Sequence, residues 1–479
     1  MSLSRRHFLH RGAAFALGFG GLHALMGMGP RALAGFAGRG VGPGSSPAAG
    51  VGYGPLVRDP RRIFDLPAGF SYTIISRAGE RMDDGLLVPG LHDGMAAFPG
   101  ASAEETILIR NHEVSPDGFN HSPFGRAGEL LSRVDRVKLY DAGGGVAPAL
   151  GGTTTIVFNT RERKVKKHFL SLGGTVRNCA GGPTPWGSWL SCEEDVTRAG
   201  ERVSRDNDAT LERDHGYVFE VPASSEGLVD PKPIIAMGRF NHEAVAVDPK
   251  SGIVYQTEDR GDGLIYRYIP ADRQNLLAGG KLQVLVVKGR PSLDTRNWQS
   301  PTVKIGEKLA VEWMDIDDVE APKDDLRQRG SAGGAAVFAR GEGMWYGRES
   351  VYFACTNGGA GQVGQIWRYT PSEFEGTSGE KETPGVLELF VEAAKAGPIE
   401  NADNITVAPW GDLVVCEDGN DDDYLHGITP TGQIYPLGHN VGSDSELAGA
   451  TFSPDGSTLF VNLQTAGMTL AIQGPWRGA

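Results

Sequence analysis

ILIRNHE, at residues 107–113, is an apolar strand-like run that ends in a carboxylate. Five further runs of this kind end in Asp, Glu, Asn or Gln: WLSCEED at 189–195, IVYQTED at 253–259, VYFACTN at 351–357, LVVCED at 413–418 and LFVNLQ at 459–464. Apolar segments rich in β-branched residues and bounded by polar ones are typical of β-strands. An oxygen-bearing side chain at the end of each strand indicates ligands that converge on one point, as in a cation site.

The composition favours an all-β chain with one large domain. Its 69 glycines among 479 residues are about twice the average usage, and 29 prolines add further turns. Short apolar runs between turn residues recur from residue 64 onward, whereas helical periodicity is scarce beyond the first 30 residues. The six units predict a six-bladed β-propeller over residues 56–479, with loop insertions at 201–214 and 322–329 and a metal site in the central channel.

Residues 1–34 are predicted to be a twin-arginine signal peptide. Arg5 and Arg6 lie in SRRHFL at 4–9, an apolar stretch follows, and ALA at 32–34 matches a cleavage site. The alternative is an ordinary arginine pair before a short buried helix. The Gly-rich residues 35–55 are predicted to be a flexible leader. We therefore expect export by the twin-arginine translocase to the periplasm or the medium, and no permanent membrane span.

The charge balance disfavours nucleic acid as a partner. Cleavage after Ala34 would remove four of the 46 basic residues, which leaves 42 against 59 acidic ones, a formal net charge of −17. An acidic surface repels the phosphate backbone of nucleic acids. The acidic excess suits either solubility outside the cytoplasm or carboxylates gathered around cations, and charge alone does not separate the two.

The densest motif is NCAGGPTPWGSWLSCEED at 178–195. Two tight turns place Cys179 before a strand whose end carries Glu193 and Glu194. Carboxylate oxygens select Ca²⁺ or Mg²⁺, while a thiolate favours a transition metal such as iron or zinc, so the set predicts a mixed cluster. The alternative for Cys179 is a buried structural thiol. The four cysteines could also form disulfides after export, and the sequence leaves their pairing open.

Two NHE triplets and one ARGEG motif add further candidates. The triplets end in Glu113 and Glu243, and their histidines lack the spacing of a zinc site, so we expect the histidines to orient the carboxylates. In ARGEG, Arg340 and Glu342 are spaced to face the same side of a strand. A guanidinium beside a metal-binding carboxylate suits a phosphate. The alternative is an exposed surface salt bridge.

These motifs, with GQIWRY at 364–369 and the closing stretches FSPDG at 452–456, LFVN at 459–462 and GPW at 474–476, resemble the PhoX alkaline phosphatases. The similarity covers nearly all of the chain after the signal peptide. It implies a six-bladed propeller, twin-arginine export and a central cluster of Ca²⁺ and Fe³⁺ that hydrolyses phosphomonoesters. It also implies that Cys179 binds iron and that Arg340 and Glu342 lie at the phosphate-binding end of the cluster.

The predicted catalytic residues are therefore Arg340, Glu342 and Cys179, and the substrates are small phosphorylated organic molecules. The predicted metal ligands are Cys179, Glu113, Glu193, Glu194, Glu243, Glu258, Asp259, Glu342, Glu417 and Asp418. The tip at 462–464 is the least favoured, because Thr465 and Ala466 stand where the family pattern has His and Pro, and the chain is shorter than the best-characterised members. We expect metal-assisted phosphoryl transfer by a monomer at alkaline pH.

Two other functions remain open from the sequence. A calcium-dependent propeller hydrolase of another class, such as a lactonase or phosphodiesterase, would share oxygen-tipped strands but would not need Cys179. A non-catalytic propeller would use the metal structurally and bind a partner on its rim. The sequence contains no G-x-S-x-G motif and no phosphate-binding P-loop, which disfavours the commonest serine and nucleotide-dependent hydrolases.

Overall fold

A computed structural model describes residues 50–145, 147–203, 210–419 and 422–477. The predicted signal peptide, 1–34, lies outside these residues, as does most of the predicted leader, 35–55. Within residues 50–55, Tyr53 packs edge-on against Phe70 and Trp476, with ring centroids 5.0 Å and 5.5 Å apart. No helix among the described residues is long and apolar enough to cross a membrane.

The described chain is all-β and propeller-like, as the sequence predicts, and every named strand pairs antiparallel with its neighbours. Two four-stranded sheets consist of β4 (His92–Pro99), β5 (Glu105–His112), β6 (Gly151–Asn159) and β7 (Lys164–Thr175), and of β24 (Leu447–Phe452), β25 (Thr458–Leu463), β26 (Met468–Gln473) and β3 (Ser71–Arg77). A three-stranded sheet consists of β8 (Asn178–Pro183), β9 (Ser188–Glu193) and β10 (Val218–Pro222).

Two larger sheets complete the described chain. A six-stranded sheet contains, in spatial order, β1 (Leu56–Val57), β2 (Phe64–Pro67), β23 (Ile434–Asn440), β22 (Tyr424–Ile428), β21 (Leu413–Glu417) and β20 (Ala402–Val407). A nine-stranded sheet contains β11 (His242–Val247), β12 (Val254–Glu258), β13 (Ile265–Pro270), β14 (Gly280–Val287), β15 (Lys308–Asp315), β19 (Val386–Glu392), β18 (Gln365–Thr370), β17 (Ser350–Cys355) and β16 (Gly341–Gly347). The α-helix of the described residues is α2 (Leu326–Gly333).

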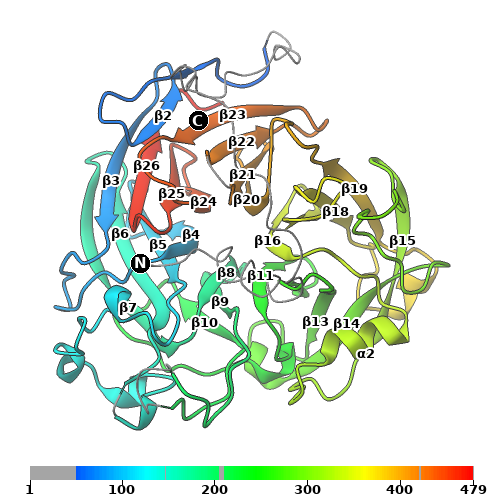
Figure 1. Cartoon of the computed structure of the whole chain (residues 1–479), viewed down its shortest axis with the longest axis horizontal. Helices are drawn as coiled ribbons and strands as arrows, with labels where there is room; N and C mark the ends of the chain where they lie inside the picture. Colours follow the sequence, from blue (N-terminus) through cyan, green and yellow to red (C-terminus); the bar gives the residue numbers. More distant parts are fainter. Residues whose placement is uncertain (1–49, 146, 204–209, 420–421, 478–479) are drawn as a thin grey trace, which may run out of the picture. The chain divides into compact units, whose positions relative to one another are not determined.

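All six oxygen-tipped runs of the sequence form strands, and each is the second strand of a consecutive pair: β4 and β5, β8 and β9, β11 and β12, β16 and β17, β20 and β21, β24 and β25. The first strand of each pair lies innermost in Figure 1. Each innermost strand contacts the next in the order β4, β8, β11, β16, β20 and β24, and β24 contacts β4 again. This closed ring of strands brings together segments that lie hundreds of residues apart.

The two ends of the described chain close the ring. Strand β3, near the start, pairs with β26, near the end, from Ser71 opposite Gln473 to Arg77 opposite Met468. Between this sheet and its neighbour, Phe158 of β6 and Phe460 of β25 pack edge-to-face with ring centroids 5.6 Å apart. Both rings are fully buried, and each such burial contributes about 1.5–3 kcal/mol.

Small residues allow the innermost strands to approach one another closely. A Cβ on Gly94 of β4 would lie 2.6 Å from Cα of Ala180 in β8, and one on Gly343 of β16 would lie 2.7 Å from Cα of Asn404 in β20. Such distances are too short for non-bonded carbon atoms, so only glycine fits at these positions. At these positions, each innermost strand therefore packs directly against the backbone of the next one.

Candidate metal centre

Two positions in each strand pair carry the side chains that meet at the centre of the ring. The first position is the second residue of the innermost strand, and its occupants are Asp93, Cys179, Glu243, Glu342, Asp403 and Ala448. The second position directly follows the paired strand, and its occupants are Glu113, Glu194, Asp259, Thr356, Asp418 and Gln464. The residues predicted as ligands from the sequence include Glu113, Glu194, Asp259 and Asp418 of the second set and Cys179, Glu243 and Glu342 of the first.

Local backbone geometry explains why these positions face inward. In all six pairs the register shifts within the first residues of the innermost strand, for example between His92 and Met95 of β4 and between His242 and Val245 of β11. A bulge of this kind re-aims a side chain out of the regular alternation. The N–H of the residue after the paired strand donates to the carbonyl just before the innermost strand, as from Glu194 to Arg177 at 3.0 Å.

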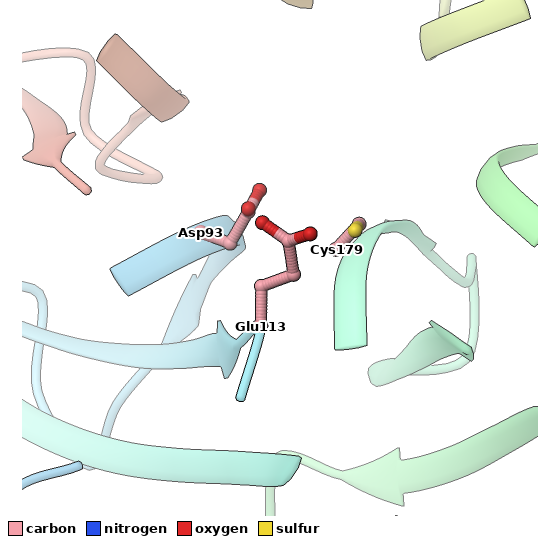
Figure 2. Close-up of side chains that lie close together, drawn as sticks. All are labelled: Asp93, Glu113 and Cys179. Carbon is pink, nitrogen blue, oxygen red and sulfur yellow. The ribbon is translucent and has the colours of Figure 1, made fainter. Parts of the chain in front are cut away.

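Three overlapping groups of side chains could each hold a metal ion, and within each group the ligand atoms lie within 4.8 Å of one another. The groups are Asp93, Glu113 and Cys179; Cys179, Glu194 and Glu243; and Glu243, Asp259 and Glu342. All of these side chains are buried. Figure 2 shows the first group, in which the carboxylates of Asp93 in β4 and of Glu113 just after β5 and the thiol of Cys179 in β8 point toward one another. Cys179 and Glu243 each belong to two groups, which joins the three into one row.

A fourth group is formed by Asp403, Asp418 and Glu446, which come from β20, the end of β21 and the residue before β24. Only Asp418 of this group was predicted as a ligand. Asn404 supports it, because its Nδ2 donates to Oδ1 of Asp403 at 3.1 Å and its Oδ1 accepts from the N–H of Gly449 at 2.9 Å. Three carboxylates without a sulfur ligand match the preference of a hard cation such as Ca²⁺.

Two arginines span the carboxylates of the row. Arg340 donates from Nε and Nη2 to the two oxygens of Asp259, both at 2.8 Å, and from Nη2 to Oε1 of Glu342 at 2.8 Å. The predicted Arg340–Glu342 pair therefore exists, but it is not an exposed salt bridge, because Glu342 is 1% exposed. Arg177, which no sequence motif singled out, lies with Nη2 2.6 Å from both Oε1 of Glu113 and Oε2 of Glu194.

Three predicted ligands, Glu193, Glu258 and Glu417, lie outside these groups in the described chain. Each is the last residue of its strand and immediately precedes a residue that does join a group. Because side chains alternate along a strand, one of two adjacent acids faces the centre and the other faces away. Glu417 accepts from the N–H groups of Glu400 and Tyr424, and Glu258 accepts from the Tyr266 hydroxyl at 2.8 Å. Burial raises the pKa of Glu258 to about 7, against the opposing charge of Arg327.

Glu193 belongs to a buried polar network behind the centre. Its carboxylate accepts from the backbone N–H groups of Val176, Gly216 and Tyr217 and contacts Nδ1 of His215 at 2.6 Å. His215 also faces Asp141, whose carboxylate accepts from the N–H groups of residues 212 and 213. Burial lowers the pKa of His215, but the charge of Glu193 and the hydrogen bonds to Asp141 and Glu193 outweigh it and raise the pKa to about 9. This network anchors the connection between β9 and β10, where the insertion at 201–214 was predicted.

The histidines of the two NHE triplets bond to other partners. His112 contacts the Gly90 carbonyl through Nδ1 at 2.9 Å and the Thr154 hydroxyl through Nε2 at 2.9 Å, and His242 donates from Nε2 to the Gly238 carbonyl at 3.0 Å. Burial lowers the pKa of both imidazoles, so both are neutral at physiological pH. Their bonds fix the backbone just before Glu113 and Glu243.

The other three cysteines lie apart from the four groups that could hold a metal ion. Cys192, Cys355 and Cys416 are buried, and no disulfide joins the four cysteines. Burial raises the pKa of the Cys192, Cys355 and Cys416 thiols, which keeps them protonated. These three side chains fit the alternative reading of a structural thiol, whereas Cys179 alone joins carboxylates.

Comparison with known proteins identifies a family and solved structures of similar fold. The sequence profile of the family described as alkaline phosphatase PhoX matches residues 51–467. Among solved structures, the PhoX of Pseudomonas fluorescens in complex with vanadate, a transition-state analogue, matches with a TM-score of 0.62 at 18% identity, over 86% of this chain and 96% of that chain. XC5397, a gluconolactonase of Xanthomonas campestris, matches with a TM-score of 0.40 at 14% identity, over 88% and 98%. No curated protein matches the sequence.

Proposed function

The chain belongs to the alkaline phosphatase PhoX family, and we propose that it releases phosphate from small organic phosphomonoesters with the candidate metal centre as its active site. The observation that carries this proposal is the row of three groups, in which a thiol and six carboxylates meet beneath two arginines. An anionic substrate needs such positive charge, and the row provides ligands for cations that would supply more.

We infer that the propeller has six blades. The nine-stranded sheet consists of two meanders, β11 to β14 and β16 to β19, joined edge to edge through β15. Counted as two blades, these meanders bring the total to six, each led by one innermost strand of the ring. Six repeats of one strand pair explain why a ligand position recurs at every strand tip.

The donor set fits a mixed cluster of Fe³⁺ and Ca²⁺. Cys179 is the soft ligand, and it would hold iron together with Asp93, Glu113, Glu194 and Glu243. Asp259, Glu342 and the separate group around Asp403 offer only oxygen and would hold Ca²⁺. When bound, these cations would neutralise charge on the phosphoryl oxygens and acidify the attacking water.

Arg340 and Glu342 would orient the phosphoryl group. The two-pronged bond to Asp259 and the bond to Glu342 fix the plane of the Arg340 guanidinium. A guanidinium oriented in this way would donate to phosphate oxygens and stabilise the charge that they carry in the transition state. The buried carboxylates beneath it would exclude all but cationic partners from the row.

Export by the twin-arginine route completes the proposal. The motif at 4–9 and the cleavage site at 32–34 support translocation after folding, which suits a protein that must acquire several cations before it leaves the cytoplasm. We propose that the enzyme acts as a monomer in the periplasm or the medium. The thiol in the row disfavours a calcium-only lactonase or phosphodiesterase, which would need oxygen ligands alone.

Activity of matched cysteine variants tests the proposed function. Cation-replete wild type, Cys179→Ala and Cys355→Ala would be assayed on a chromogenic phosphomonoester and a chromogenic phosphodiester. Both thiols are fully buried, but only Cys179 joins a metal-binding group among the described residues. Loss of most activity in Cys179→Ala alone is expected. Cation-replete wild type that fails to hydrolyse phosphomonoesters, or a Cys179→Ala variant as active as Cys355→Ala, would contradict the proposal.

A further inference from the structure

We propose that Arg177 is a second phosphate-binding residue, which forms with Arg340 a pair of guanidiniums over the buried carboxylates. This inference deepens the proposed function and rests on it. It concerns a residue that no motif or family resemblance singled out and that only the structure brings to the centre.

Arg177 and Arg340 occupy equivalent positions in two strand pairs. Each directly precedes an innermost strand, β8 for Arg177 and β16 for Arg340. Each precedes by two residues a member of the metal-binding row, Cys179 or Glu342. Each carbonyl accepts the N–H of the residue that follows the paired strand, from Glu194 at 3.0 Å and from Thr356 at 3.1 Å.

Their backbone and their partners match as well. Arg177 has φ of 48° and Arg340 has φ of 53°, a left-handed conformation that few residues other than glycine adopt. Leu91 and Asn401, which precede β4 and β20, have the same conformation, so it belongs to the backbone that the strand pairs share. Each side chain also binds a carboxylate from the neighbouring strand pair that comes before it in the chain. Arg177 binds Glu113, which follows β5, and Arg340 binds Asp259, which follows β12. Arg177 and Arg340 are therefore structurally equivalent residues in two of the strand pairs.

Exposure shows which groups an incoming ligand meets first. The side chains of Arg177 and Arg340 are 24% and 21% exposed, whereas those of the four carboxylates that they bind are 1–7% exposed. The described chain uses other arginines differently, because Arg110 and Arg239 are buried to 0% and 2% exposure within the protein. The guanidiniums therefore form the solvent-facing layer over the acids, and an anion that reaches the centre meets them before the carboxylates.

The two guanidiniums lie at opposite ends of the row of carboxylates. Arg177 binds members of the first and second groups, and Arg340 binds members of the third. Once cations take the carboxylate oxygens, the ion pairs weaken and each guanidinium can turn its planar donors to another anion. A phosphoryl group, with three oxygens to share between cations and two guanidiniums, fits that requirement.

The test measures competitive inhibition by inorganic phosphate alongside cation content. Wild type, Arg177→Ala, Arg177→Lys and Arg368→Ala would be purified in cation-replete form. Arg368 is a matched control, since its side chain is 27% exposed and pairs with Glu388 at 2.7 Å on outer strands. We expect Arg177→Ala and Arg177→Lys to keep their cations and to raise the inhibition constant of phosphate about 10- to 100-fold, as for a lost charge-assisted hydrogen bond. Arg368→Ala should match wild type.

Two results would overturn the assignment. Unchanged phosphate inhibition in Arg177→Lys with full cation content would mean that Arg177 does not touch phosphate. Loss of cations in both Arg177 variants, with activity falling in proportion and unchanged phosphate inhibition in the remaining active enzyme, would make it a positioning residue for Glu113 and Glu194. Both results require that wild type hydrolyses phosphomonoesters and is inhibited by phosphate. A wild type that does neither would overturn the proposed function itself.

Discussion

The thiol of Cys179 donates to Oε2 of Glu194 across 2.9 Å, although the two residues are 15 positions apart in the chain. The preceding residue, Glu193, points the other way and bonds to His215 and three backbone N–H groups. Two adjacent, buried acids thus have different roles, and substitutions can separate them.

Glu194→Gln and Glu193→Gln are predicted to have opposite consequences. Glu194→Gln should lower iron content and phosphatase activity, because it removes an anionic ligand that lies beside Cys179. Glu193→Gln should lower stability by about 3–5 kcal/mol, because it leaves buried His215 without its charged partner, while the remaining folded enzyme keeps its cations. Elemental analysis and thermal unfolding of both variants check this. Equal loss of cations in both variants would contradict the conclusion that Glu194 faces the centre and Glu193 faces away from it.

Stability should depend on pH through His215. Its pKa in the folded protein, about 9, lies above its ordinary value of 6.5, so its stabilising contribution is complete below about pH 6.5 and is lost as the pH rises through 9. The Tm difference between wild type and His215→Gln should therefore be largest near pH 6 and should shrink by pH 10. A difference that stays constant over this range would show that His215 is not protonated in the folded protein.

His168 provides the contrasting case on β7. Burial and the charge of Arg110 hold the pKa of this histidine well below 6.5. Its depressed pKa means that protonation in the unfolded chain costs wild type stability as the pH falls below 6.5. Wild type should therefore lose Tm relative to His168→Gln between pH 7 and pH 5, the reverse of the trend for His215. If the Tm difference from wild type changed with pH in the same direction for both variants, His168 and His215 would not differ in charge in the folded protein.

The closed ring should not tolerate side chains at its glycines. In Gly343→Ala, the new Cβ would lie 2.7 Å from Cα of Asn404 and from the carbonyl of Asp403, so we expect a loss of about 1–3 kcal/mol and disturbance of the group around Asp403. Gly227→Ala is the matched control, since nothing lies within 4 Å of a Cβ there. Chemical denaturation measures both variants. Equal stabilities would mean that the innermost strands pack less closely than described.

Removal of Ca²⁺ should lower the free energy of unfolding of the protein. Ligands that bind only the folded state add stability by mass action, about 2.7 kcal/mol for one site at 100 times its Kd. A chelator selective for Ca²⁺ should lower the Tm of wild type, and the effect should be smaller in Asp403→Asn, which removes the negative charge of one ligand of the fourth group. The same Tm shift in both proteins would indicate that Ca²⁺ binds elsewhere.

The sequence predicted the fold class and the inward-facing tips because both follow from local patterns. Runs such as 107–113 and 253–259 alternate or cluster apolar residues as strands require, and each forms a second strand in the structure. Turn residues between them mark short antiparallel connections. The resemblance to PhoX then rested on long motifs such as 178–195, and the family match confirms it.

The choice between adjacent acids could not be made from the sequence. A shift of one residue in strand register exchanges the faces of Glu193 and Glu194, of Glu258 and Asp259, and of Glu417 and Asp418, and register is set by pairing with distant strands. In the tip at 351–357, the inward position is Thr356 rather than the predicted Asn357. The tip least favoured as a ligand, Gln464, lies at the centre, where Nε2 donates to Asp93 and Glu113 at 2.9 Å and 2.8 Å.

Asp93, Asp403, Glu446 and Arg177 were missed because they lie at the starts of innermost strands rather than at strand tips. A sequence signal exists in hindsight: HDG at 92–94, HEA at 242–244 and GEG at 341–343 each place an acid before a small residue. The acid enters the centre because a bulge follows it, and the small residue allows the close approach of the next strand. Bulges depend on pairing with the neighbouring strand, so a single strand does not reveal them.

Elemental analysis of the protein folded in its native host, purified without chelators, tests the central claim most directly. The account predicts iron together with Ca²⁺ in wild type and in Cys355→Ala, and loss of iron in Cys179→Ala. Protein that hydrolyses phosphomonoesters with Ca²⁺ alone, or a Cys179→Ala variant with the same iron content as wild type, would contradict a mixed centre built around this thiol.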